Sequence, residues 1–148
     1  FESPKVFDKL LLPEDAMERQ AIVIANPLGE DFSIMRTVSL NGMLTSLATN
    51  YNRRNKVARL YELGNIYLPK ALPLTELPDE KMRLTLGMYG AGDFFDMKVV
   101  VEEIFDKLGV TGAECEPSND ITSGSSGSYP EGKIGSWIYW TDSSGGRR

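Results

Sequence analysis

The segment Ser39–Arg54, SLNGMLTSLATNYNRR, has the clearest helical pattern in the chain. Its apolar side chains recur at spacings of three and four residues, which places them on one face of an α-helix. Thr37 or Ser39 is expected to cap this helix by accepting a hydrogen bond from a free amide of the first turn. The pattern therefore predicts an amphipathic helix whose apolar face consists of Val38, Leu40, Met43, Leu44, Leu47, Ala48 and Tyr51.

Extended segments are predicted on both sides of this helix. Before it, Ala21–Pro27 is a short run rich in β-branched residues, which is typical of a buried strand. After it, Val57–Leu68 has the composition of a strand, and Gly64 predicts a bend within it. A proline-rich loop leads to a second strand, Lys81–Tyr89. Its period of two places Met82, Leu84, Leu86 and Met88 on one side, and Arg83, Thr85 and Tyr89 on the other.

A second helix is predicted to follow, capped at its start by Asp93 or Asp96 and ended by Gly109. The composition then changes, because residues 121–148 are rich in serine and glycine and contain no leucine. We therefore expect a folded domain over residues 1–120 and a flexible tail over residues 121–148. The apolar stripe of the second helix is Met97, Val100, Val101, Ile104, Phe105 and Leu108.

Composition excludes several classes of catalyst. The 148 residues contain no histidine and one cysteine, Cys115, so neither a Ser-His nor a Cys-His pair can form. The glycine-rich stretch Gly87–Gly92 lacks the Lys-Ser/Thr pair of a phosphate-binding loop, and a strand-to-helix turn explains it better. No catalytic, cofactor-binding or metal-binding residue is assigned. The low cysteine content and the absence of a long apolar run lead us to expect a soluble, cytoplasmic protein that does not contact membranes.

A short basic cluster follows the first predicted helix, with Tyr51 and Tyr61 close by in the sequence. Basic residues interleaved with aromatic ones can bind phosphates and stack on bases, which would suit an RNA contact. A solvated helix end is the simpler interpretation, because positive charge there complements the helix dipole. The net charge of −5 also argues against a surface built to bind nucleic acid. The cluster consists of Arg53, Arg54, Lys56 and Arg59.

Three motifs occur in order between Asn26 and Tyr67. Asn26-Pro27-Leu28 comes first, Met35-Arg36-Thr37 opens the predicted helix, and Leu60-Tyr61-Glu62-Leu63-Gly64 lies in the strand after it. Together with the flanking segments, they resemble the catalytic-like module of the β subunit of bacterial phenylalanyl-tRNA synthetase. The resemblance covers about residues 1–118. It ends where the family continues with a His-Pro-Gly-Arg segment, which is absent here.

The resemblance implies an α+β fold related to the class II synthetases, with an antiparallel sheet and flanking helices, present here as a partial module. It also implies a non-catalytic role in assembling an α2β2 phenylalanine–tRNA ligase. ATP, magnesium and phenylalanine would bind to the α subunit, and this chain would bind no cofactor. The chain would contact tRNA only indirectly or weakly. The alternative is an RNA-binding module that uses the basic cluster. On the assembly hypothesis, the expected subunit-interface residues are Leu40, Met43, Leu44, Leu47 and Tyr51.

Overall fold

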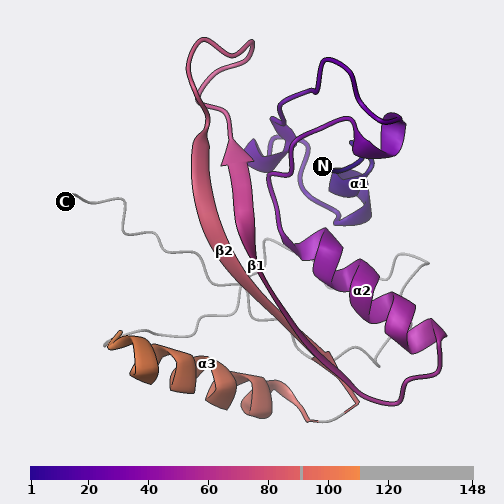
Figure 1. Cartoon of the computed structure of the whole chain (residues 1–148), viewed down its shortest axis with the longest axis vertical. Coiled ribbons are helices and arrows are strands. Elements are labelled where there is room, and N and C mark those ends of the chain that lie inside the picture. Colours follow the sequence, from indigo (N-terminus) through magenta and orange to yellow (C-terminus); the bar gives the residue numbers. More distant parts are fainter. Residues whose placement is uncertain (91, 111–148) are drawn as a thin grey trace.

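The computed structural model describes residues 1–90 and 92–110. Its architecture is α+β, with one two-stranded antiparallel sheet and helices packed around it (Figure 1). Cys115 and the tail of residues 121–148 lie outside the described residues. The elements in chain order are α1 (Val6–Lys9), the 3-10 turns η1 (Met17–Arg19) and η2 (Glu30–Phe32), α2 (Leu40–Asn52), β1 (Ala58–Leu68), β2 (Asp79–Tyr89) and α3 (Phe94–Leu108).

The hairpin of β1 and β2 is the centre of the fold. Its register runs from the pair Ala58 and Tyr89 to the pair Leu68 and Asp79 without interruption. The predicted bend at Gly64 is wrong, because β1 continues through this residue. Gly64 serves a steric purpose instead, since a Cβ there would collide with the guanidinium of Arg36.

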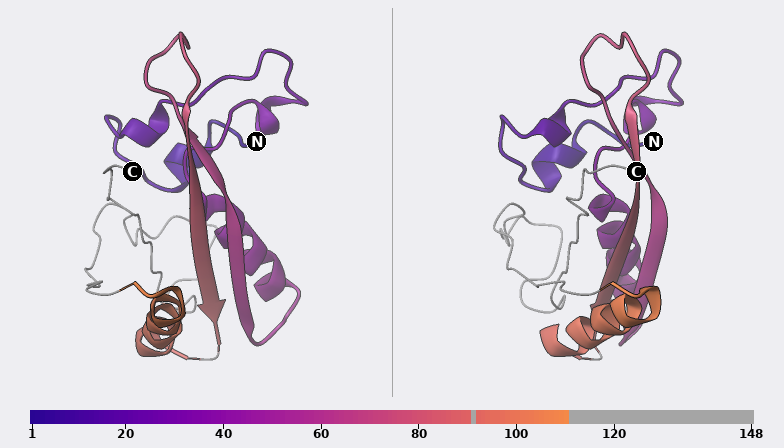
Figure 2. Two further views of the ribbon diagram at one scale, coloured as in Figure 1. Left: turned by 60° about the vertical axis from the view of Figure 1, so that its left-hand side comes forward. Right: turned by 90° about the vertical axis from the view of Figure 1, so that its left-hand side faces the viewer.

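Helix α2 covers one face of the hairpin, as the two views in Figure 2 show. Met43 and Leu47 pack there with Ala58 and Tyr89 in one buried cluster. Gly87 allows the close approach, because a Cβ at this position would lie 2.8 Å from Leu47 Cδ1 and from Met43 Cγ. The predicted helix is thereby confirmed, and its apolar face packs on the sheet of the same chain.

The less apolar side of β2, and not the side with the methionines and leucines, packs against α2. The helix packs on the side that carries Thr85 and Tyr89, which are 3% and 2% exposed. The more apolar side of the strand faces away from α2, and Met82 on that side is 66% exposed. The hairpin therefore has one covered face and one largely open face.

The N-terminal segment forms a separate layer beside the start of α2. The predicted strand Ala21–Pro27 is wrong, because the only bridge in this segment joins Val23 to Ile34, and the Val23 side chain is exposed. The partner backbone turns into α2 soon after Ile34, so a longer ladder has no room to form. This layer is held by a hydrophobic cluster of Val6, Phe7, Leu10, Leu12, Ala21, Ile34, Val38 and Leu40.

Helix α3 confirms the second helical prediction. Asp93 and Asp96 form a reciprocal capping box at its start, and Gly109 ends it in the left-handed conformation with φ of 70°. Only part of the predicted stripe is buried, since Met97 and Val101 are covered whereas other stripe residues remain exposed. No helix within the described ranges has the length and apolar character needed to cross a lipid bilayer.

Candidate functional site

Hydroxyl groups join the start of α2 to its surroundings. Thr85 Oγ1 donates to Ser39 Oγ at 2.7 Å, and Thr37 Oγ1 donates to the backbone oxygen of Glu18 at 2.5 Å. Neither hydroxyl accepts a bond from the first turn of α2, so the predicted helix cap is wrong. Both side chains instead hold the helix against the sheet and the N-terminal layer.

A polar cluster, formed by Glu2, Arg36, Asn41 and Glu62, lies beside this contact. The Arg36 guanidinium pairs with the Glu62 carboxylate, and its Nε donates to the Asn65 backbone oxygen at 2.6 Å. The Tyr67 amide donates to the Arg36 backbone oxygen at 2.9 Å. These bonds fasten the segment before α2 along the side of β1.

Gly42 of α2 gives the polar cluster its space. A Cβ at Gly42 would lie 3.2 Å from Glu62 Oε2, tighter than ordinary van der Waals contact. The group that lies against this glycine is therefore the Glu62 carboxylate. Because that carboxylate already binds Arg36, its charge is neutralised at the contact.

Glu2 brings the N-terminus into the same cluster. Its Oε1 accepts a hydrogen bond from Asn41 Nδ2 at 3.3 Å, while Oε2 is buried and has no partner among the described residues. Burial raises the pKa of the Glu2 carboxyl above its usual value, although the Asn41 hydrogen bond and the charge of Arg36 act in the opposite direction. No local pattern in the sequence indicated this site, because its members are far apart in the chain.

The expected subunit-interface residues lie mostly inside the chain. Leu40, Met43 and Leu47 are 4%, 3% and 0% exposed, and they pack on the N-terminal layer and the hairpin. Leu44 and Tyr51 are half-buried at the borders of the same clusters. A partner could therefore reach this set only through Leu44 and Tyr51, and its contact with another subunit stays a prediction.

The expected RNA-contact residues are all exposed near the junction of α2 and β1. Arg53 and Arg54 follow the end of α2, and Lys56 lies in the connection. Arg59 belongs to β1 and lines a cavity on the side away from α2, so the four side chains do not share one surface element. An RNA contact here stays a prediction.

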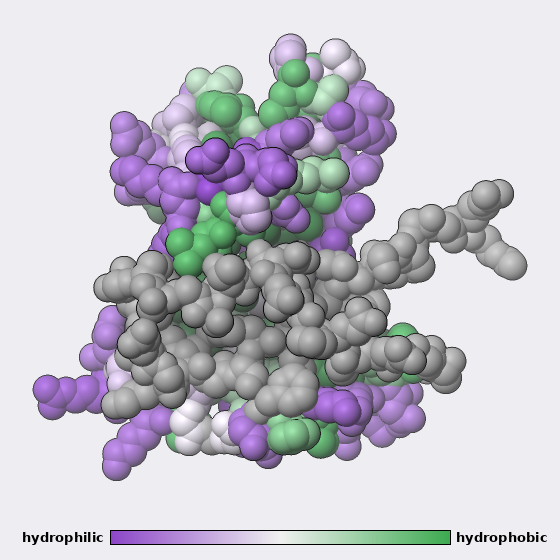
Figure 3. Space-filling view, turned by 180° about the vertical axis from the view of Figure 1, so that it is seen from behind, coloured by the Kyte–Doolittle hydropathy of each residue, from purple (hydrophilic) through white to green (hydrophobic). Residues whose placement is uncertain are grey.

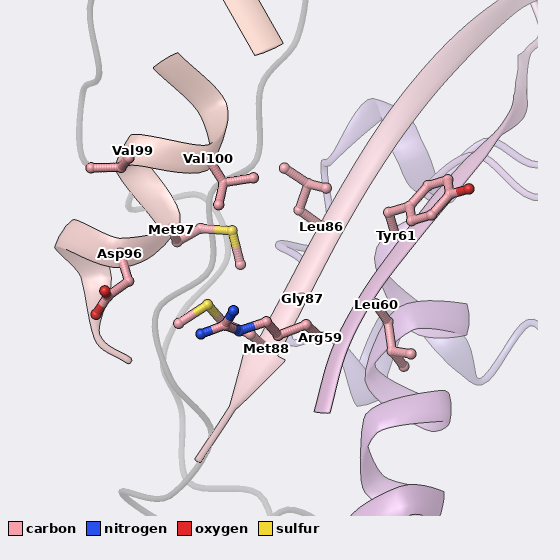
Figure 4. A pocket seen from close by; sticks show the side chains of 10 residues that line it. All are labelled: Arg59, Leu60, Tyr61, Leu86, Gly87, Met88, Asp96, Met97, Val99 and Val100. Carbon is pink, nitrogen blue, oxygen red and sulfur yellow. The ribbon is translucent and has the colours of Figure 1, made fainter. Parts of the chain in front are cut away.

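A cavity of about 370 Å³ separates α3 from the hairpin. Figure 4 shows Met97 and Val100 pointing from α3 toward the strand, with Leu86 and Met88 of β2 pointing back toward the helix. Asp96 points away from this space (Figure 4). The lining is mainly apolar, and within the described ranges no three His, Cys, Asp or Glu side chains are grouped so as to hold a metal ion. The cavity thus suits apolar contacts.

The same side of the hairpin carries an apolar patch, here called the open face, beyond the reach of α3. In the space-filling view from behind, hydrophobic residues show among hydrophilic ones in the upper part of the molecule (Figure 3). Sequence alternation identified the β2 half of the open face, but nothing in the pattern showed that α2 would leave it uncovered. The open face consists of Tyr61, Leu63, Met82 and Leu84, which are 76%, 61%, 66% and 37% exposed.

Comparison with known proteins gives one consistent result. The sequence model described as "Phenylalanyl tRNA synthetase beta chain CLM domain" matches residues 1–127. The chain is 51% identical over 110 residues to the phenylalanine–tRNA ligase beta subunit of Clostridium acetobutylicum, covering 74% of this chain and 14% of that protein. It is 44% identical over 110 residues to the same subunit of Clostridium tetani, with the same coverage. For Symbiobacterium thermophilum the identity is 35% over 127 residues, covering 78% of this chain and 14% of that subunit.

The chain thus spans about one seventh of the length of these curated relatives. The match includes the segment before α2, the helix itself and the hairpin, which are the parts joined by the polar cluster. On this match the chain belongs to the family of the phenylalanyl-tRNA synthetase β chain CLM domain.

Proposed function

We propose that the chain is a non-catalytic structural module of a phenylalanine–tRNA ligase β subunit, which supports the α subunit that charges tRNA in an α2β2 assembly. In this proposal ATP, magnesium and phenylalanine bind the α subunit. The hairpin with its flanking helices would be part of a larger class II synthetase-like sheet. The family membership supports the assignment to a β subunit. The structural role is supported by the polar side chains, which bind other parts of the same chain.

The observation that carries the proposal is how the polar side chains between α2 and the sheet are used. Arg36 binds Glu62 and the backbone of β1, and Thr85 binds Ser39. Each of these groups is engaged in holding one element of the chain to another, and substrate binding would require breaking those bonds. The cavity lining is mainly apolar. Such an arrangement suits a rigid scaffold.

The outer side of α2 is the proposed contact with the α subunit. Leu44, Ala48 and Tyr51 lie three or four residues apart and are half-buried, so they form a narrow apolar row along the helix. Exposed polar residues, including Thr45 and Asn52, lie beside this row. A narrow apolar seam with polar flanks is the pattern by which helices pack on partner helices.

Co-purification with the α subunit tests this contact. Thr45→Arg places a long charged side chain beside the row without touching the core, and we expect it to weaken the complex. Thr75→Arg is the matched control, because it makes the same change at an exposed position in the loop between β1 and β2. Equal complex formation by both variants would refute the proposed contact. Synthesis of phenylalanyl-adenylate by the purified chain alone would refute the non-catalytic role.

The alternative of tRNA binding is less well supported. Its four basic residues are divided between the end of α2, the connection and β1, in a chain with a net charge of −5. Phosphate contacts would make tRNA affinity fall steeply with salt concentration, so a tRNA titration at several salt concentrations separates this function from assembly.

A further inference from the structure

We propose that Glu2 is a proton-dependent switch: its protonated carboxyl holds the start of the N-terminal layer against α2, and its ionised carboxyl loosens that contact. The proposal goes beyond the assembly role described above, because it concerns how one layer of this chain is attached and does not involve the α subunit. It rests on the backbone bonds of Glu2, on the environment of its carboxyl and on the charges around it.

Backbone hydrogen bonds join Glu2 to the segment that leads into α2. The Glu2 amide donates to the Ile34 backbone oxygen at 2.9 Å. The Glu2 backbone oxygen accepts from the amides of Ser33 and Ile34, each at 3.1 Å. The side chain of Glu2 extends from this bridge, so a movement that takes the carboxyl into water also strains or breaks the backbone bonds.

The side chain of Glu2 contacts α2 through Asn41. Its Oε1 accepts a hydrogen bond from Asn41 Nδ2 at 3.3 Å. The Oδ1 atom of the same asparagine accepts from Nζ of Lys9, in α1, at 3.3 Å. Because one oxygen of a carboxyl can accept a hydrogen bond whether or not the other carries a proton, the Asn41 contact is available to both forms of Glu2.

The other carboxyl oxygen decides which form the site favours. Glu2 Oε2 is buried and has no hydrogen-bond partner within the part of the chain that the structure describes. Burying an unpaired ionised carboxylate costs far more free energy than burying an unpaired neutral group. The docked position of Glu2 therefore favours the protonated carboxyl.

The charges around Glu2 do not offset this burial. Arg36, in the segment before α2, and the amino group of Phe1 both favour the ionised form, whereas Glu62 of β1 disfavours it. Arg36 is itself paired with Glu62, and α2 carries no charged residue. Burial is the largest influence on the pKa of Glu2 and raises it; the Asn41 bond and the two positive charges act against burial, and Glu62 adds to it.

The direction of the switch follows from this raised pKa. Once released into water, the Glu2 carboxyl has its usual pKa of 4.5, so below pH 4.5 it is protonated in both positions and docking is strongest. Between pH 4.5 and the higher pKa of docked Glu2, only the released form ionises, and the docking equilibrium weakens by about tenfold per pH unit. The start of the layer is therefore held more weakly at neutral pH than in acid.

Amide hydrogen exchange of the 148-residue chain, resolved by NMR, tests the switch in the parent and in Glu2→Gln. Glutamine keeps the acceptor for Asn41 but cannot ionise, and comparison at equal pH cancels the intrinsic pH dependence of exchange. The protection of Ser33 and Ile34 in the variant, relative to the parent, should rise with pH above 4.5. The rise should be about tenfold for each unit by which docking raises the pKa of Glu2.

Glu14→Gln is the matched control, because it makes the same change at an exposed position of the N-terminal segment. It should follow the parent chain at every pH. A variant-to-parent ratio for Glu2→Gln that does not change with pH would overturn the proposal. A carboxyl-carbon NMR titration in which Glu2 of the folded parent ionises at or below pH 4.5 would do the same.

Low concentrations of urea distinguish release of the layer from unfolding of the whole chain. Local release exposes little surface, so exchange at Ser33 and Ile34 should hardly respond to urea, whereas exchange at Leu47, within α2, should accelerate. An equally steep response at all three amides would refute a local switch. These measurements use the chain alone, so their outcome is independent of the proposed contact with the α subunit.

Discussion

The hydrogen bond between Thr85 and Ser39 offers a direct test of which face of the hairpin α2 covers. Both side chains are buried, at 3% and 2% exposure, and their oxygens are 2.7 Å apart. Thr85→Val keeps the shape of the side chain and removes the donor, leaving the Ser39 oxygen buried without this bond. Leaving a buried polar group unpaired costs about 1–3 kcal/mol of unfolding free energy, and Ser39→Ala should cost a similar amount.

The double variant decides the interpretation. With both hydroxyls removed, no polar group remains unpaired at this contact, so the combined cost should be smaller than the sum of the two single costs. We expect a coupling of about 1 kcal/mol or more, measured by urea unfolding of the parent chain, both single variants and the double variant. Met82→Thr, on the open face, is the control and should change stability by less than about 0.5 kcal/mol at protein concentrations where the chain is monomeric. Additivity within about 0.3–0.5 kcal/mol would refute the proposed energetic coupling between the two hydroxyls.

Three further changes test the packing, the helix cap and the buried carboxyl. Leu47→Ala should cost about 3–5 kcal/mol, because this side chain is 0% exposed and its removal leaves a cavity against Gly87; thermal or urea unfolding measures it. Asp93→Ala should cost about 0.5–2 kcal/mol and Asp93→Asn less, because only the alanine removes the oxygen that caps α3; a smaller loss with alanine than with asparagine would contradict this. Glu2→Gln tests the raised pKa: the parent chain loses stability as pH rises through the pKa of folded Glu2, whereas glutamine stays neutral. The free energy of unfolding of the variant, relative to that of the parent chain, should therefore rise toward neutral pH. This advantage should disappear below about pH 4.5, the usual pKa of the group. A difference in unfolding free energy that stays constant across this pH range would show that the Glu2 carboxyl does not cause the pH dependence.

Local patterns in the sequence predicted the main elements well. The apolar spacing located α2, the alternation located β2, and the Asp93 and Gly109 signals located both ends of α3. Each of these features is set by neighbouring residues, so it can be found without knowing the tertiary fold. The two errors in strand assignment, at Ala21–Pro27 and Gly64, arose where partner segments decide the structure.

The functional surfaces depend on contacts that no local pattern encodes. The apolar stripe of α2 predicted burial correctly, but it could not show that the burying surface belongs to the same chain. From the alternation alone, Thr85 would be expected to face solvent. In the structure it faces α2 and donates a hydrogen bond to the Ser39 hydroxyl. Gly87 explains why α2 packs on this face of β2, because only the face that carries this glycine lets Met43 and Leu47 approach closely.

The two edge strands of the sheet differ in how far their outer backbone groups are hydrogen-bonded. On the outer edge of β1, the Tyr67 amide donates to the backbone oxygen of Arg36. An extended peptide arriving beside β1 would have to displace Arg36, whereas in the described part of the chain β2 has no backbone partner along its outer margin. Growth of this sheet by strand addition, whether in normal folding or in amyloid-like aggregation, is therefore directional and begins at β2. In deuterium exchange, the outward-facing amides of β2 should accordingly lose their protons before the amide of Tyr67 does.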